Sequence, residues 1–147
     1  MQDAPDSFGE TWAEAERQPV EYWQNFTRSV TEPESHVMFL ACGDRAIYGS
    51  TYGLIDRDRP RAGRVGGMWV DPRWRRQGIG QALLEAIFAW VDEREFTTLG
   101  LWAPAHRLAA VSLYRKMGFH ETGNQRPLPT NPTLDIIEMT CDLKRQR

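Results

Sequence analysis

The chain is poor in cysteine and lacks the leader pattern of a secreted protein. Its two cysteines, Cys42 and Cys141, do not have the CxxC spacing of redox and metal motifs. The opening residues carry neither the basic region nor the apolar run of a signal peptide. We therefore expect a reduced, cytoplasmic environment, in which both cysteines are core residues of apolar strands.

Long apolar runs and an excess of positive charge are also missing. No apolar stretch approaches the roughly 18 residues that span a bilayer. The formal net charge of −2 at pH 7 gives no broad basic field of the kind that nucleic-acid binding requires. We expect neither a membrane nor a nucleic acid as partner, and any anion site must be local.

Motifs for metal and hydrolase chemistry are absent as well. The histidines His36, His106 and His120 have no ligand spacing among themselves, so no metal site is predicted. Ser50 lies in Gly-Ser-Thr-Tyr-Gly, which is not the Gly-x-Ser-x-Gly of a nucleophile elbow. These absences exclude the common metalloenzyme and serine-hydrolase classes.

What the sequence does contain is the composition of one ordinary globular domain. Its 147 residues are 41% hydrophobic and 26% charged, so we expect a single domain over residues 1–147. Periodicity predicts a layered α/β (α+β) fold. The predicted strands are residues 37–41, 46–55, 65–70, 98–102 and 134–141, and the predicted helices are 19–30, with a shorter one before it, about four turns from Ile79, and 108–117.

Turn residues separate these elements. Gly43 and Asp44 suit a tight hairpin between the first two strands. Residues 56–63 are charged and contain a proline, which indicates a loop. Residues 123–132 hold three prolines and are predicted to form an ordered loop beside the site.

Residues 68–81 are the most informative segment. A strand ends there, a basic loop with Arg73, Arg75 and Arg76 follows, and Gly78 and Gly80 open a helix. The free amides of a helix start carry partial positive charge, and glycine lets a ligand approach the backbone. The segment therefore suits a diphosphate, with Arg73 expected to be only a solvated charge.

Two common phosphate loops do not match this segment. A P-loop needs Gly-Lys-Ser/Thr, which does not occur, and a dinucleotide fingerprint needs a third glycine where this chain has Leu83. The pattern that remains is Arg/Gln-x-x-Gly-x-Gly/Ala, formed by Arg75, Gly78 and Gly80.

A second block, residues 113–119, reads Leu-Tyr-Arg-Lys-Met-Gly-Phe. Together the two blocks resemble the GCN5-related N-acetyltransferase (GNAT) superfamily from residue 41 to the C-terminus. The resemblance implies a mixed, twisted central sheet flanked by helices, with the ligand bound where two parallel strands part. It also implies a first strand, which we expect to be missing from this chain.

The resemblance also implies site residues, with acetyl-CoA as co-substrate. Strand residues Met68, Trp69 and Val70 would bond the pantetheine arm, and Tyr114 would protonate the departing thiolate. The loop that would bind the pyrophosphate comprises Arg75, Arg76, Gln77, Gly78, Ile79, Gly80 and Gln81.

Three positions depart from the family pattern. Arg107 stands where many members have an asparagine that contacts coenzyme A. Trp102 stands near the place of a glutamate that serves as base. Glu138 is the remaining candidate base, although an outward strand charge is its simpler interpretation.

We therefore expect an N-acetyltransferase that moves an acetyl group from acetyl-CoA to a primary amine of a small molecule or peptide, by direct transfer in a ternary complex. Polyamine, aminoglycoside, amino acid and protein amines all remain open as acceptors. The alternatives are a non-catalytic acyl-CoA sensor and a nucleotide-phosphate binder. A free sheet edge would also allow a homodimer.

Overall fold

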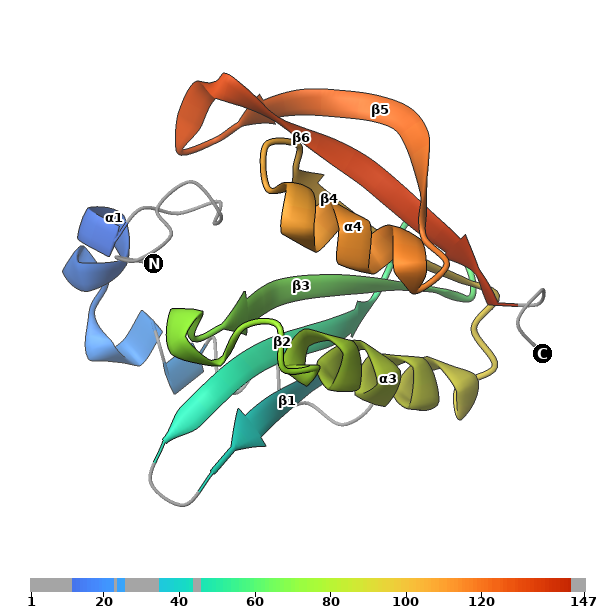
Figure 1. Ribbon diagram of the computed structural model, residues 1–147, viewed down its shortest axis with the longest axis horizontal. Coiled ribbons are helices and arrows are strands. Elements are labelled where there is room, and N and C mark those ends of the chain that lie inside the picture. Colours follow the sequence, from blue (N-terminus) through green and yellow to red (C-terminus); the bar gives the residue numbers. More distant parts are fainter. Residues whose placement is uncertain (1–11, 23, 26–34, 44–45, 144–147) are drawn as a thin grey trace.

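The computed structural model describes residues 12–22, 24–25, 35–43 and 46–143, which form a twisted sheet with helices (Figure 1). The strand order is β1-β2-β3-β4-β6-β5. The strands are β1 (His36–Cys42), β2 (Ile47–Ile55), β3 (Ala62–Val70), β4 (Thr98–Pro104), β5 (His120–Leu128) and β6 (Asn131–Asp142). The helices are α1 (Trp12–Arg17), the 3-10 turn η2 (Pro72–Trp74), α3 (Ile79–Asp92) and α4 (Leu108–Lys116).

The sheet is mixed, as the resemblance implied. β1, β2 and β3 are antiparallel neighbours, and β4, β6 and β5 form a second antiparallel group. The two groups meet in one parallel pair, β3 with β4, which α3 connects. A parallel pair needs such a crossover, because a tight turn can join only antiparallel strands.

β3 and β4 part halfway along their length. They pair from Ala62 with Thr98 to Val65 with Leu101. Beyond this point, Gly66, Trp69 and Val70 of β3 pair with β2, and residues 102–104 of β4 pair with β6. In Figure 1 the two halves of the sheet diverge towards the left of the view. We call this region the strand split, in which β3 and β4 no longer pair with each other.

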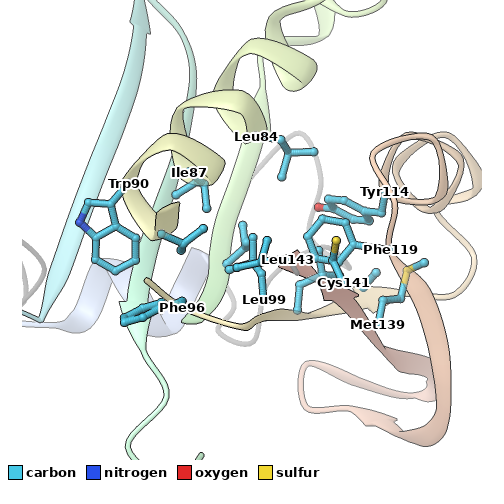
Figure 2. Packing of buried hydrophobic residues seen from close by; sticks show 14 of the residues in the cluster. Leu84, Ile87, Trp90, Phe96, Leu99, Tyr114, Phe119, Met139, Cys141 and Leu143 are labelled. Atoms are coloured by element: carbon cyan, nitrogen blue, oxygen red, sulfur yellow. The ribbon is translucent and has the colours of Figure 1, made fainter. Parts of the chain in front are cut away.

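α3 and α4 cover the same face of the sheet and enclose the core. Leu84, Ile87 and Val91 of α3 are fully buried, as their helical spacing predicts. They pack in one cluster with Leu99 of β4 and Met139 of β6 (Figure 2). Truncating Leu84 to alanine would cost about 2–5 kcal/mol in the free energy of unfolding.

Most predicted elements are confirmed, including the hairpin between β1 and β2, where the Gly43 amide donates to the Ala46 carbonyl at 3.0 Å. The predicted short first helix is α1. Of the predicted helix 19–30, residues 20–22 and 24–25 are helical, and the rest from residue 26 lies outside the described residues. So do residues 1–11, where the first strand of the family would lie.

The predicted loop over residues 123–132 is wrong. Residues 120–128 form β5, an edge strand paired with β6, and β6 begins already at Asn131. Pro127 misled the prediction, because proline is tolerated on an edge strand, where its missing amide is not needed by a second neighbour. β3 likewise begins at Ala62, inside the predicted loop 56–63.

The prediction that both cysteines are core residues is half right. Cys141 on β6 is buried, whereas Cys42 at the end of the edge strand β1 is exposed. In the described part of the chain, no helix has the length and apolar character needed to cross a membrane.

Candidate active site

The split end of β3 is shaped by a β-bulge. The register between β2 and β3 shifts between Ser50 and Tyr52, and Gly67 adopts a φ of 58°. The Tyr52 ring covers this point so closely that a Cβ on Gly66 would lie 2.4 Å from its Cζ. Bulges occur next to active sites because they redirect a strand. Here the bulge directly precedes Met68, Trp69 and Val70.

A capped turn follows β3 and sets the direction of the basic loop. The Asp71 carboxylate accepts the Arg73 amide at 2.9 Å and the Arg73 guanidinium at 2.6 Å. These hydrogen bonds from Arg73 lower the pKa of Asp71 to about 2. Trp74 stacks on Tyr48 of β2 with ring centroids 4.4 Å apart. The Arg73 side chain is 78% exposed, as expected of a solvated charge, and it also holds the turn.

The loop between η2 and α3 presents its backbone to solvent. Residues 75–78 are exposed, and both Arg76 and Gly78 have positive φ, 61° and 85°. A Cβ on Gly78 would meet no atom within 4 Å. Left-handed positions turn successive amides to one side of the chain, which creates a concave anion site.

The first turn of α3 lacks a side-chain cap. Gly78 is its N-cap residue and makes no side-chain hydrogen bond to the helix amides. The amides of Ile79, Gly80 and Gln81 therefore have no side-chain acceptor in the helix itself. Uncapped amides at a helix start favour a phosphate group.

Gly80 is where the two sequence motifs meet. A Cβ there would lie 2.9 Å from Cδ2 of Leu113 in α4 and 3.8 Å from Cγ2 of Val70 in β3. The absence of a side chain at this position lets α3 approach α4 closely. The fold thus brings the basic loop, the end of β3 and the Leu-Tyr block to one place.

Two basic side chains place positive charge at the loop between η2 and α3. Arg75 Nε donates to the Val70 carbonyl at 3.0 Å, which ties the loop to the end of β3. Lys116 Nζ on α4 donates to the Gln81 side chain at 3.2 Å, next to the start of α3. The sequence reasoning missed Lys116, although it lies inside the second motif, because only the tertiary contact places its charge beside the loop.

Tyr114 lies on the α4 side of the core. It is 7% exposed and packs edge-on against Phe119, and Figure 2 shows its hydroxyl pointing away from α4. Burial raises the pKa of Tyr114 to about 12. The hydroxyl therefore keeps its proton at neutral pH and can act as a hydrogen-bond donor but not as a base.

Arg107 is the N-cap residue of α4, directly beyond β4. Its Nε is the one buried side-chain nitrogen or oxygen without a hydrogen-bond partner in the residues described. A buried donor without an acceptor is costly, which suggests that a ligand supplies the acceptor.

Glu138 is not the outward charge that the sequence suggested. It is 4% exposed and accepts hydrogen bonds from Asn124 at 2.8 Å, Thr122 at 3.0 Å and Arg59 at 3.1 Å. The Asn124 hydrogen bond above all lowers its pKa, and the other two donors act the same way, outweighing burial. Its cross-strand neighbour is Trp102, over whose ring the Arg126 guanidinium lies at 4.4 Å. A carboxylate so stabilised is a weak base.

The described residues include no group of three or more His, Cys, Asp and Glu side chains that could hold a metal ion.

Comparison with known proteins gives consistent results. The acetyltransferase (GNAT) family profile matches residues 1–119. The ribosomal protein bS18-alanine N-acetyltransferase of Escherichia coli K12 is 42% identical over 106 residues, which cover 71% of this chain and 68% of that protein. The aminoglycoside N(6')-acetyltransferase type 1 of Stenotrophomonas maltophilia is 30% identical over 121 residues, 76% of this chain and 74% of that protein.

Solved structures agree on the fold. A GCN5-related N-acetyltransferase from Kribbella flavida superposes with a TM-score of 0.75 at 19% identity, over 95% of this chain and 84% of that one. The ribosomal-protein-S18-alanine N-acetyltransferase of Escherichia coli gives 0.68 at 23% identity, over 97% and 89%. With the family profile covering most of the chain, the resemblance is confirmed: the chain belongs to the acetyltransferase (GNAT) family and is an acetyl-CoA-dependent enzyme that transfers an acetyl group to an amine.

Proposed function

We propose that this enzyme, a single domain of residues 1–147, acetylates the α-amine at the N-terminus of a polypeptide. One observation carries the choice of acceptor: Trp102 stands where relatives would carry a base, and the nearby Glu138 is held by three donors. An enzyme without a strong base needs an acceptor that loses its proton easily. An α-amine has a pKa of about 7.7–8.0, against about 10.4 for lysine.

The pairing of charged groups on the face of the sheet opposite α3 and α4 supports an α-amine as the acceptor. The buried carboxylates of this face, Glu138 and Asp56, are each paired with an arginine, Arg59 at 3.1 Å and Arg64 at 2.9 Å. A polycation such as an aminoglycoside needs unpaired negative charge for tight binding. The 42% identity to an alanine N-acetyltransferase of a ribosomal protein supports the same choice.

The loop geometry supports a proposal for how the cofactor binds. The amides of residues 76–81 bind the pyrophosphate, with charge from Arg75, Arg76 and Lys116. The backbone of Met68, Trp69 and Val70 bonds the pantetheine arm along the strand split. Arg107 donates its orphaned Nε hydrogen to a pantetheine oxygen, in place of the asparagine of other members.

The transfer is direct. The neutral amine nitrogen forms a bond to the acetyl carbon, the carbon–sulfur bond breaks, and the ammonium proton leaves to water. Tyr114 stabilises the departing thiolate by donating a hydrogen bond, because its raised pKa keeps the O–H intact. Holding both reactants in one complex supplies much of the rate.

The test is a thiol-release assay with matched acceptors. Three acceptors are compared. They are a peptide with a free N-terminus, the same peptide with an N-formyl group and a lysine, and an aminoglycoside. We expect release only with the free N-terminus, and mass spectrometry should place the acetyl group there. Faster turnover of the aminoglycoside or of the blocked peptide would refute the proposal that the acceptor is an N-terminal α-amine. Binding of acetyl-CoA without turnover of any amine would instead support an acyl-CoA sensor.

The pH dependence provides a second check. With no protein base, kcat/KM should rise tenfold per pH unit and level off at the pKa of the acceptor amine, about 7.7–8.0. Replacing the N-terminal residue by one with a different α-amine pKa should move the midpoint by the same amount. A midpoint that does not follow the acceptor would indicate a base on the enzyme.

A further inference from the structure

Glu138 lies on the face of the sheet that α3 and α4 leave uncovered. Its neighbours on β6, Ile137 and Met139, belong to the core beneath the helices, and alternate strand residues point to opposite faces. Its partner Trp102 is the first residue of β4 beyond the last pair with β3. Glu138 therefore lies level with the start of the strand split.

Its hydrogen bonds tie three separate segments together. Thr122 and Asn124 donate from β5, and Arg59 donates from the connection between β2 and β3, 79 residues away in the sequence. A buried carboxylate requires such donors, because the cost of removing it from water must be offset. Each donor is therefore held in place by the same buried charge.

The β5 segment needs this support. The register between β5 and β6 shifts between Glu121 and Gln125, and Gly123 has a φ of 92°. The residues in between are held by side chains instead, since Thr122 also accepts the Asn124 amide at 3.2 Å. Without Glu138, this bulge would keep few of its contacts.

The connection between β2 and β3 is fixed in the same way. The Arg59 amide donates to the Asp56 carbonyl at 3.3 Å, and its guanidinium reaches across the sheet to Glu138. The Arg59 side chain is 53% exposed, so it forms part of the surface that an arriving molecule meets.

In the described part of the chain, α3, α4 and the cofactor loop occupy one side of the sheet, so we expect an acceptor to approach from the opposite face or from the open end of the split. We infer that Glu138 is a positioning residue that fixes the β5 bulge and the β2–β3 connection as the two walls of the acceptor site. The inference rests on the proposed acyl transfer for its kinetic test, but not for its structural one.

The structural test is hydrogen exchange of the unliganded protein. In Glu138→Ala, the donors of both segments lose their acceptor, because Arg59 bonds Oε1 whereas Thr122 and Asn124 bond Oε2. We expect amides of residues 57–59 and 122–125 to exchange about tenfold faster together, while those of α3 and β4 keep their rates. Faster exchange in only one segment, or unchanged exchange in both, would overturn the inference whatever the enzyme acetylates.

The kinetic test compares two arginines of the same connection. Arg59 and Arg61 have similar side-chain exposure, 53% and 59%, but Arg61 bonds the Glu95 carbonyl instead. Arg59→Ala should raise KM for the acceptor about tenfold and leave KM for acetyl-CoA within about twofold. Arg61→Ala should change neither.

The same assay distinguishes a positioning role of Glu138 from a role as general base. If Glu138 were the base, Glu138→Gln would lower kcat by about 100-fold or more and shift the pH profile, without raising KM for the acceptor. A positioning role predicts the reverse: a raised KM and an unchanged pH midpoint. Equal effects of Arg59→Ala and Arg61→Ala, or an equal rise in KM for acetyl-CoA, would also contradict the inference. If no peptide is acetylated, the amine that is turned over serves as the acceptor, so the proposed acceptor can fail while this inference stands.

Discussion

Tyr114 is the single side chain whose chemistry can be tested most directly. Replacing it by phenylalanine removes one oxygen from a 7% exposed ring and leaves the packing against Phe119 in place. If its hydroxyl stabilises the thiolate, Tyr114→Phe should lower kcat by about 100-fold or more while the Kd of acetyl-CoA changes little. Thiol release and calorimetry measure the two quantities.

The tyrosine variant has an informative control. Phe119→Leu perturbs the same part of the core without touching the hydroxyl, so it should reduce the free energy of unfolding by about 1 kcal/mol and leave kcat nearly unchanged. A kcat for Tyr114→Phe equal to that of the wild type would remove Tyr114 from the proposed mechanism.

Gly78 and Gly123 form a matched pair for testing the anion site. Both have a φ near 90°, 85° and 92°, and a Cβ on either would meet no atom within 4 Å. Alanine at either position should cost about 1–2 kcal/mol of stability, because left-handed backbone disfavours a Cβ. Only Gly78→Ala should also weaken acetyl-CoA binding, since its methyl group would project from the loop that we propose binds the pyrophosphate.

Denaturant unfolding and calorimetry on both variants decide the question. The expected result is similar destabilisation with a loss of affinity in Gly78→Ala alone. Equal affinities would mean that the loop conformation does not serve the cofactor.

At the scale of elements, the turn between β3 and α3 should be sensitive to acid. The Arg73 hydrogen bonds hold the pKa of Asp71 at about 2, below the unfolded value of about 3.9. The ionised carboxylate therefore stabilises the fold fully above about pH 4, and this contribution is lost as the pH falls towards 2. Asp71→Asn should flatten that part of the curve of unfolding free energy against pH.

Urea unfolding between pH 7 and pH 2.5 measures the curve. Asp56→Asn is not a clean control, because hydrogen bonds and charge from Arg64 lower the pKa of Asp56 despite its burial. Asp135→Asn is more suitable, since Asp135 is exposed on β6. If Asp71→Asn and the wild type lose stability in parallel, the cap does not contribute.

The edge strand β5 shows why one element escaped prediction. Its sequence carries Gly123 and Pro127, both of which usually mark loops, and eight of its nine residues are exposed. No hydrophobic alternation marks it as a strand. β5 exists because β6 offers a free edge and Glu138 holds the bulge, and both conditions depend on residues distant in the sequence.

At the scale of the whole molecule, acetyl-CoA should stabilise the fold. Ligand at 100 times its Kd adds about 2.7 kcal/mol to the free energy of unfolding, which raises Tm by about 5–10 °C in a chain of this size. A thermal scan with acetyl-CoA measures this shift, and ATP at equal concentration should produce little. A comparable shift with ATP would favour a general nucleotide-phosphate site.

Among the strands that the structure describes, β1 and β5 lie at the outer edges of the sheet. An unpaired edge can accept a strand of a second copy, so the homodimer stays a prediction that sedimentation can test. The exposed Cys42, at the end of β1, provides a convenient labelling position for that measurement.

The sequence alone determined the parts of this protein that depend on local order. The strand, basic loop, two glycines and long helix of residues 68–92 are contiguous, so their spacing predicts an anion site, and the Leu-Tyr block adds the family. Tertiary structure decided what depends on contacts between distant segments. Gly80 meets Leu113, Lys116 meets Gln81, and Glu138 is buried among donors from two other segments, because packing and desolvation act across the whole chain.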